Sequence, residues 1–251
     1  MLHAHRVALF EDPTDPYSQS LAQDFATQFQ HDGGTIVATE KYTVGKAATL
    51  PPDLQDALSK NPACIYFSGY ANDASTLLTD LPPGNMPVMG GDALYELGGY
   101  PSSARAGFSR LHFTSFAYPD EWGVLGMGVK QPDFFTSYVA AFDPNHLHVG
   151  DPYGFTRADN DAILSYDATV ALLHAVVNAQ TQAKQDTITT QQVQQALHNL
   201  KGVNAFQGVS GQIAFDANGD PIDKSIVILY VDPNGFIKME PHIEGKFLLG
   251  A

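Results

Sequence analysis

Short runs of apolar residues without any charge recur through the first half of this chain, and amphipathic segments separate them. The most sharply bounded run covers residues 63–67, between Pro62 and the turn-forming pair Ser68-Gly69. A short apolar run bounded by turn residues is typical of a strand that is buried on both faces in a parallel sheet. Similar strands are predicted at residues 6–10, 35–41, 86–89 and 111–115. Such strands need cover on both faces, which restricts the chain to folds that pack helices on a sheet.

Helical patterns occupy the intervals between these strands. One helix is predicted at residues 18–30, ending at Gly33-Gly34, and a second opens at Pro51-Pro52. A third is predicted at residues 73–81, with Asn72-Asp73 as its N-cap. The alternation predicts an α/β fold with a three-layer, mostly parallel, doubly wound sheet.

Longer helical patterns dominate the second half of the chain. Helices are predicted at residues 133–142, 158–183 and 191–200, and strands at residues 212–215, 225–231 and 236–239. We therefore expect an α/β domain over residues 1–119, a helical segment over residues 120–210, and strands within residues 211–251 that return to the sheet. The apolar faces of the first two of these helices need cover, so a homodimer through exposed apolar helices is one expectation.

The charge balance excludes one class of partner. The formal net charge is −14 and the isoelectric point is about 4.8, so the protein repels phosphate backbones and nucleic acid is not an expected ligand. The sequence has no run of eighteen apolar residues, so no membrane span is expected. The first residues do not resemble a signal sequence. The single cysteine, Cys64, is expected to be a small buried residue of its strand.

Several motifs, weak one by one, occur in a characteristic order. They are Val7-Ala-Leu-Phe-Glu-Asp12 followed by Tyr17-Ser18, Gly33-Gly34 before a strand, Ile65-Tyr-Phe-Ser-Gly-Tyr70, Pro87-Val-Met-Gly-Gly-Asp92, Ser165-Tyr-Asp-Ala168, and Gly208-Val-Ser-Gly-Gln-Ile-Ala-Phe-Asp-Ala-Asn-Gly-Asp220. Together they resemble the type I periplasmic solute-binding proteins, in the branched-chain amino-acid or extracellular ligand-binding receptor branch that serves ABC importers. The resemblance implies a C-terminal portion: a nearly complete second lobe of the type I fold, plus helices that normally cover the first lobe.

The resemblance implies an amino-acid pocket with an aromatic wall and one acid for the ammonium group, and Tyr17, Tyr70 and Asp92 fall on its contact positions. The chemistry agrees, because a carboxylate binds an ammonium group strongly in a partly dry cleft and tyrosine rings attract cations. Other roles are open for each residue: a helix N-cap for Asp92, packing at a helix start for Tyr17, and a loop aromatic for Tyr70.

Three further residues are candidates for the same pocket. Ser68 ends its strand and is either a ligand donor or a turn hydroxyl. Phe116 and Tyr118 follow the strand at 111–115, and either line the cleft, form a hinge, or pack within the loop.

Metal and catalytic chemistry have little support. His146 and His148 are interpreted as loop residues rather than a zinc pair, and the segment 216–220 as a turn rather than a calcium loop. No Gly-x-Ser-x-Gly elbow is present. An α/β enzyme using Asp92 or Asp12 as a base is the less favoured alternative. We expect no catalytic residues, no metal and no cofactor.

The expected function is therefore binding of an amino acid or similar small polar solute, without catalysis, in an extracytoplasmic location and without a signal sequence in this chain. The expected partners are the solute, and an ABC permease or the missing N-terminal lobe. A ligand-sensing domain of a signalling receptor is the main alternative.

Overall fold

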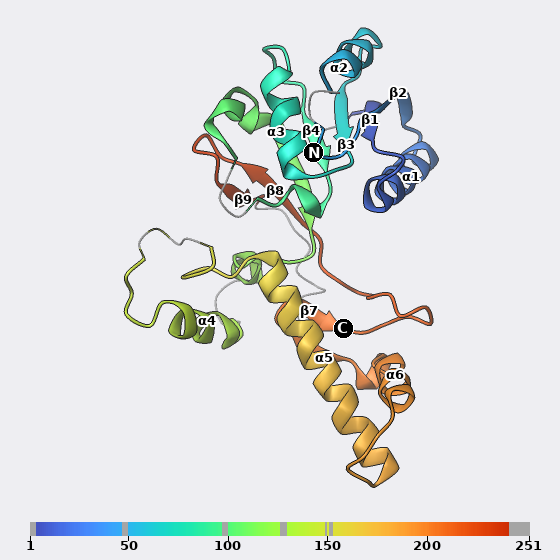
Figure 1. Cartoon of the computed structure of the whole chain (residues 1–251), viewed down its shortest axis with the longest axis vertical. Coiled ribbons are helices and arrows are strands. Elements are labelled where there is room, and N and C mark those ends of the chain that lie inside the picture. Colours follow the sequence, from blue (N-terminus) through green and yellow to red (C-terminus); the bar gives the residue numbers. More distant parts are fainter. Residues whose placement is uncertain are drawn as a thin grey trace. The chain divides into compact units, whose positions relative to one another are not determined.

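The computed structural model describes residues 4–46, 50–96, 100–125, 130–148, 150 and 153–240 (Figure 1). Within these residues the chain forms two compact units. The α/β unit comprises residues 4–115 and 228–240, and the helical unit comprises residues 116–227.

The α/β unit is built on a seven-stranded sheet with strand order β2-β1-β3-β4-β5-β8-β9. Its strands are β1 (Arg6–Glu11), β2 (Thr35–Lys41), β3 (Cys64–Phe67), β4 (Val88–Gly90), β5 (Leu111–Ser115), β8 (Val227–Val231) and β9 (Ile237–Met239). All described pairs from β2 to β5 are parallel, whereas β8 and β9 pair antiparallel. The predicted fold class, a mostly parallel doubly wound sheet, is confirmed.

Three helices alternate with the parallel strands: α1 (Pro16–His31), α2 (Leu50–Ser59) and α3 (Ala71–Asp80). Two stretches of 3₁₀ helix follow, at Asp92–Leu94 and Ser102–Arg110. The start of α1 is encoded locally, because the Asp15 side chain accepts a hydrogen bond from Ser18 N at 2.8 Å and Pro16 occupies the first turn. Its inner face packs on the sheet, where the Phe25 ring stacks on Tyr66 with a centroid distance of 3.6 Å.

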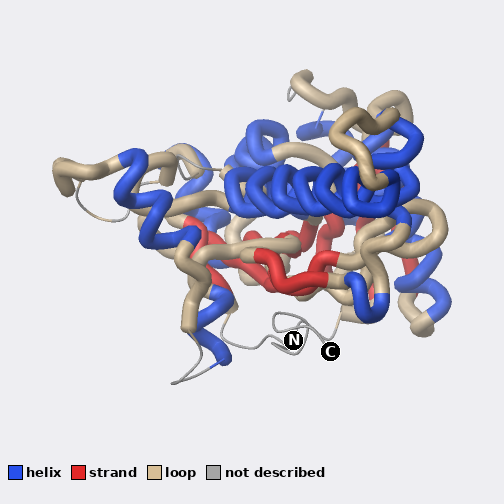
Figure 2. The backbone as a smooth tube through the Cα atoms, turned by 90° about the horizontal axis from the view of Figure 1, so that it is seen from below, coloured by secondary structure: helices blue, strands red, loops and turns tan. Residues whose placement is uncertain are grey.

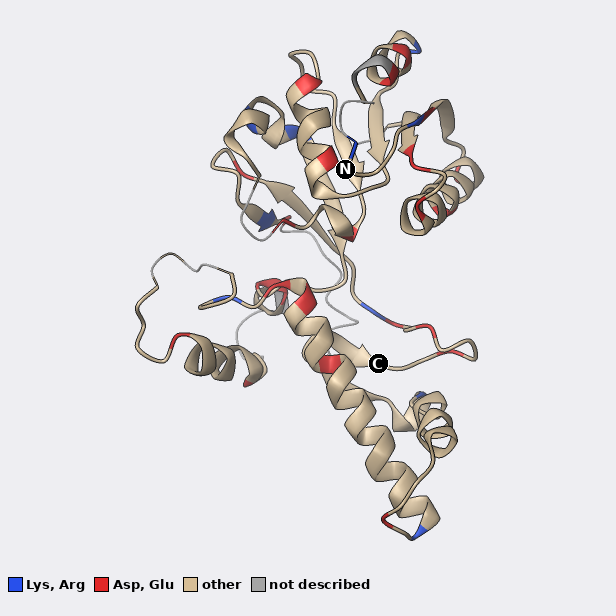
Figure 3. Cartoon of the chain, in the orientation of Figure 1, with Lys and Arg blue, Asp and Glu red and all other residues tan. Residues whose placement is uncertain are grey.

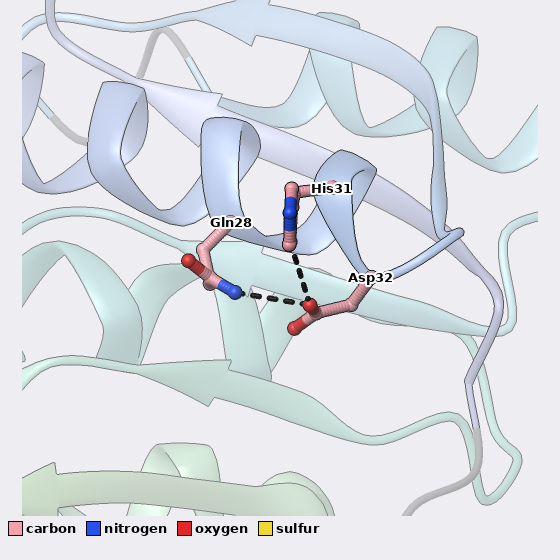
Figure 4. A network of polar contacts seen from close by, with 3 residues as sticks. All are labelled: Gln28, His31 and Asp32. Atoms are coloured by element: carbon pink, nitrogen blue, oxygen red, sulfur yellow. Dashed lines mark hydrogen bonds and ion pairs between the residues drawn. The ribbon is translucent and has the colours of Figure 1, made fainter.

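The other end of α1 is closed by polar contacts on the surface. Asp32 Oδ1 accepts a hydrogen bond from Gln28 Nε2 at 3.0 Å and lies 3.2 Å from His31 Nδ1 (Figure 4). The hydrogen bond from Gln28, followed by that from His31, lowers the pKa of Asp32. These contacts anchor the turn before β2 and are separate from the site described below.

The predicted N-cap of α3 is wrong. The helix begins at Ala71 with Tyr70 in the N-cap position, and no side chain caps it. Asp73 is buried and accepts a hydrogen bond from Gly45 N at 3.0 Å. The Asp73 carboxylate therefore binds the loop after β2, although the local sequence pattern predicts that it caps α3.

The helical unit contains α4 (Phe134–Phe142), α5 (Asn160–Ala183) and α6 (Thr190–His198), with short 3₁₀ turns at Glu121–Leu125 and Gly202–Asn204. Figure 2 shows α5 as a long straight helix. Ala171, Ala175 and Ala179 lie on its buried face, and the last two share a cluster with Ala196 of α6. Among the described residues, α5 is the one helix long and apolar enough to cross a membrane, but its packing on α6 and the buried carboxylate of Asp167 indicate a core helix.

One predicted strand does not return to the main sheet. β7 (Gly211–Ile213) instead forms a separate antiparallel pair with β6 (Phe206–Gly208). The connection is a tight turn, in which Gly211 has φ +95° and Asp167 accepts hydrogen bonds from Val209 N and Ser210 N. These hydrogen bonds fix the hairpin to α5. After the helical unit, the chain returns to the seven-stranded sheet through β8 and β9.

A second apolar face of α5 is left open. Tyr166, Leu173 and Val177 are spaced by seven and four residues, and 45–59% of each is exposed. The sequence of α5 has no Lys, Arg, Asp or Glu after Asp167, and Figure 3 shows most of this helix without charged residues. The Phe134 ring of α4 adjoins this face, with its centroid 4.7 Å from that of Tyr166. The prediction of exposed apolar helix faces is confirmed for α5.

Candidate functional site

The candidate site lies where neighbouring parallel strands of the α/β unit end. Phe10, Phe67 and Gly90 are in register across β1, β3 and β4, so the segments that follow these strands emerge at the same edge. The sheet order reverses between β1 and β3, and open α/β sheets bind ligands at such a switch point. Polar and aromatic residues follow each strand, at Asp12, Ser68, Tyr70 and Asp92.

Tyr17, Tyr70 and Asp92 come together at this edge. Tyr17 Oη donates a hydrogen bond to Asp92 Oδ1 at 2.7 Å and accepts one from Ala93 N at 3.2 Å. The Tyr70 ring lies beside the Tyr17 ring, with a centroid distance of 5.5 Å and an interplanar angle of 40°. All three side chains are half-buried. The result is one carboxylate bordered by two phenol rings, on a surface that remains open to solvent.

The environment keeps the Tyr17 phenol protonated. Burial, and then the hydrogen bond to Asp92, raises the pKa of Tyr17 well above its usual value. Burial also raises the pKa of Tyr70, with a smaller contribution from the charge of Asp15, whose carboxylate lies 3.4 Å from Tyr70 Oη. Both hydroxyls therefore remain hydrogen-bond donors at neutral pH.

Gly91 allows this arrangement to form. A Cβ atom at this position would lie 2.7 Å from Tyr17 Oη and 2.6 Å from Leu21 Cδ2. Contacts of that length are not tolerated, so a larger residue would push the Tyr17 ring away from Asp92. Glycine is thus required for close packing rather than for an unusual backbone conformation.

Ser68 has a different position from the one expected of a ligand donor. It is fully buried, and its hydroxyl donates to Ser18 O at 2.6 Å. Ser18 Oγ donates in return to Ser68 O at 2.5 Å, and Tyr42 Oη donates to the same oxygen at 3.0 Å. This reciprocal pair of hydrogen bonds joins the start of α1 to the end of β3. Ser68 therefore has a structural role beside the site, and its side chain does not face solvent.

Asp12 is also occupied by structural contacts. Its Oδ1 accepts hydrogen bonds from Thr14 N and Thr14 Oγ1, and its Oδ2 accepts one from Val44 N at 2.8 Å. The hydrogen bond from Val44, followed by that from the Thr14 side chain, lowers the pKa of Asp12. A carboxylate with these contacts is a poor general base. Its role is to hold two loops at the edge of the sheet.

Phe116 and Tyr118 belong to the helical unit. Phe116 is 44% exposed, whereas Tyr118 is fully buried. The Arg157 guanidinium lies over the Tyr118 ring, 5.1 Å from its centroid, and forms an ion pair with Asp120 at 2.9 Å. The sequence interpretation missed Arg157, because a single arginine in a loop carries no spacing signal.

The helical unit also has an open cleft of about 540 Å³ beside α4. Its walls are mainly apolar and include Phe135, Val139 and Ala158, and both residues of the Arg157–Asp120 ion pair also line it. Because that ion pair is already neutralised, the cleft lacks the open charge found at Asp92.

The other motifs from the sequence lie in loops. His148 stacks on Phe155 with a centroid distance of 3.7 Å. Asp216 Oδ1 accepts hydrogen bonds from Asn218 N and Asp220 N, which confirms a turn at residues 216–220. Within the described ranges no group of three or more His, Cys, Asp or Glu side chains could hold a metal ion. Cys64 is buried as predicted.

Comparison with known proteins identifies the fold. A family model described as the receptor family ligand binding region matches residues 128–234. A leucine-binding protein, LivK from Thermotoga maritima, superposes with a TM-score of 0.71 and 24% identity over 96% of this chain and 61% of its own. The isoleucine complex of LivJ from Streptococcus pneumoniae gives 0.66 and 22% identity over 97% of this chain and 61% of its own.

A third structure, a periplasmic binding protein type 1 from Bordetella pertussis, gives a TM-score of 0.70 and 18% identity over 96% of this chain and 62% of its own. The chain thus spans about three fifths of the length of these structures. A search of curated proteins found no match. The predicted resemblance to type I periplasmic binding proteins is confirmed by the family model and by the shared fold.

Proposed function

We propose that this chain is an extracytoplasmic solute-binding domain that holds the ammonium group of an amino acid, or of a similar small polar solute, without catalysing a reaction. The observation that carries this proposal is the hydrogen bond from Tyr17 Oη to Asp92 Oδ1, with the Tyr70 ring alongside, at the switch point of the sheet. The shared fold supports it, because a leucine-binding protein and an isoleucine complex of a second binding protein superpose on nearly the whole of this chain. An ABC permease is the proposed partner.

The contacts of Asp92 leave one of its carboxylate oxygens available to a ligand. Tyr17 uses Asp92 Oδ1, and no hydrogen bond among the described residues uses Oδ2. An ammonium group at Oδ2 would form a charge-assisted hydrogen bond, and the phenol faces of Tyr17 and Tyr70 would attract the same cation. Tyr17 fixes the carboxylate in place, so less side-chain entropy is lost on binding.

The chain supplies one side of a clamp in this proposal. It spans about three fifths of its relatives, and the open face of α5 fits helices that pack on another lobe of the fold. We therefore expect weak binding by the chain alone, with a dissociation constant of about a millimolar. The homodimer through α5 stays a prediction, which sedimentation equilibrium of the chain would test.

The test is a titration of the chain, followed by NMR chemical shifts, with leucine and with N-acetyl-leucine. Leucine should shift resonances at the edge of the sheet, whereas N-acetyl-leucine, which has no ammonium group, should not. Asp92→Asn should weaken binding by about 2 kcal/mol or more, because the cation loses its charged partner. The matched control is Asp80→Asn, which changes an exposed residue at the end of α3 and should have no effect.

Two results would count against the proposal. Equal binding by the Asp92→Asn variant would remove Asp92 from the site. Equal binding of both ligands would show that the ammonium group is not recognised. A dissociation constant below about a micromolar for the monomer would contradict only the half-clamp argument.

A ligand-sensing role is the second candidate function, because the matching family model is described as a receptor ligand binding region. The same pocket would serve either role. Reconstitution in vesicles with the membrane protein encoded by the adjoining reading frame would separate transport from sensing. Only an ABC importer would move the solute across the bilayer.

A further inference from the structure

The helical unit contains a buried carboxyl group that the proposed function does not use. Glu121 is 0% exposed, and its Oε1 has no hydrogen-bond partner in the part of the chain that the structure describes. The carboxyl group accepts a long hydrogen bond at Oε2 from Ser225 Oγ, at 3.4 Å, and a further hydrogen bond from the backbone of Tyr118. An ionised carboxylate in such a place would lack a donor at Oε1 to compensate for its removal from water.

The position of Glu121 in the chain gives this group a structural role. Within the described residues the polypeptide passes from one unit to the other after Ser115 and again before Ile228. Glu121 follows the first passage closely, and Ser225 shortly precedes the second, so their contact joins the two connecting segments. The neighbouring Trp122 fixes the first segment further, because its Nε1 donates to Val209 O at 2.8 Å.

The charged neighbours decide which group carries a proton. Asp167 accepts hydrogen bonds from Val209 N, Ser210 N and Ser210 Oγ. Lys224 Nζ donates to Ser210 O, Ser210 Oγ and Gln212 O, so Asp167 and Lys224 are linked through Ser210. One ammonium group therefore acts on two carboxyl groups, of which Asp167 has donors at both oxygens and Glu121 has none at Oε1.

Four neighbouring groups and burial set the protonation of Glu121. The charges of Lys224 and Asp167 and the hydrogen bonds from Ser225 and from the backbone of Tyr118 act on its carboxyl group. Burial raises the pKa of Glu121 to about 8, although the charge of Lys224 acts in the opposite direction.

We propose that Glu121 is a proton-dependent brace: it is protonated at neutral pH, and its deprotonation leaves a buried charge without a donor at Oε1, which opens the segment around Glu121 and Trp122 to water. The folded unit then holds the proton more tightly than the unfolded chain does. The stability contributed by the proton is complete below the ordinary value of 4.5, declines as the pH rises toward about 8, and is lost above it.

Trp122 provides the assay, because it is the single tryptophan of the chain and adjoins Glu121. Its emission should shift to longer wavelength as the full chain is titrated from about pH 6 to about pH 9.5, with a midpoint near 8. Glu121→Gln should abolish the transition and keep the emission of the neutral form. The matched control is Glu40→Gln on the edge strand β2 of the other unit, which should leave the transition unchanged.

Two results would overturn the proposal: emission that does not change with pH in the unsubstituted chain, or the same midpoint in the Glu121→Gln variant. Infrared spectroscopy of the unsubstituted chain gives a second measurement that does not depend on a variant. The carbonyl band of a protonated carboxylic acid should persist at about pH 7 and disappear by about pH 9.5. Its absence at neutral pH would refute the brace.

Discussion

Asp167 is the residue whose loss should damage the helical unit most. It is buried on α5 and accepts three hydrogen bonds: Val209 N at 2.8 Å, Ser210 N at 2.7 Å and Ser210 Oγ at 2.5 Å. Gly208 is packed against the same carboxylate, since a Cβ there would lie 2.7 Å from Asp167 Oδ2. The side chain thus holds the β6–β7 turn on the helix and also balances the charge of Lys224.

The cost of Asp167→Ala follows from these contacts. Each buried N–H left without an acceptor costs about 1–3 kcal/mol, and two are left. The Ser210 hydroxyl can rotate to another acceptor, but the Lys224 ammonium loses a nearby opposite charge, which adds to the cost. We expect a loss of about 4 kcal/mol in the free energy of unfolding of the helical unit.

Urea unfolding followed by Trp122 fluorescence measures this unit separately from the α/β unit. With an m-value of about 2 kcal/mol/M, the midpoint should fall by about 2 M. Asp186→Ala is the matched control: it removes an exposed aspartate from the turn after α5 and should change stability by less than about 0.5 kcal/mol. A loss below about 1 kcal/mol in Asp167→Ala would show that water or relaxed backbone replaces the carboxylate, and would refute the reasoning.

Three further predictions concern the edge of the sheet and a helix start. Gly91→Ala should displace Tyr17 from Asp92 and weaken leucine binding about tenfold in the NMR titration, a loss of about 1.4 kcal/mol, and unchanged affinity would show that the ring adapts. The pKa of Asp12 is lowered, so the stabilisation from its carboxylate is present above pH 3.8 and is lost as the pH falls below that value. Acid unfolding of Asp12→Asn, followed by circular dichroism, should therefore depend less steeply on pH. An equal slope in both proteins would show that Asp12 does not contribute to acid unfolding. Thr189→Ala removes the capping box of α6 and should cost about 1 kcal/mol in urea unfolding of the helical unit, with no change if the cap is frayed in solution.

Part of the candidate site could be predicted from the sequence. Tyr17, Tyr70 and Asp92 each follow or adjoin the end of a predicted strand, and parallel strands bring such residues to one edge. The direction of each side chain could not be predicted. Ser68 precedes Gly69 and Tyr70 in the chain, yet its hydroxyl turns inward to Ser18. Asp12 and Asp73 are likewise used by backbone N–H groups of the loop at residues 42–46.

The sequence by itself determined the α/β class, the parallel strands and the long apolar helix, because these depend on local runs and periodicities that need no partner to be recognised. Only the tertiary structure decided which carboxylates are consumed by backbone donors and which stays open, since those donors come from distant segments such as Val44 for Asp12 and Val209 for Asp167. The same holds for β7, whose pairing with β6 depends on the contact between Asp167 and the hairpin turn, 42 residues apart in the chain. Local sequence carries no record of such contacts, and they determine where charge remains available for a ligand.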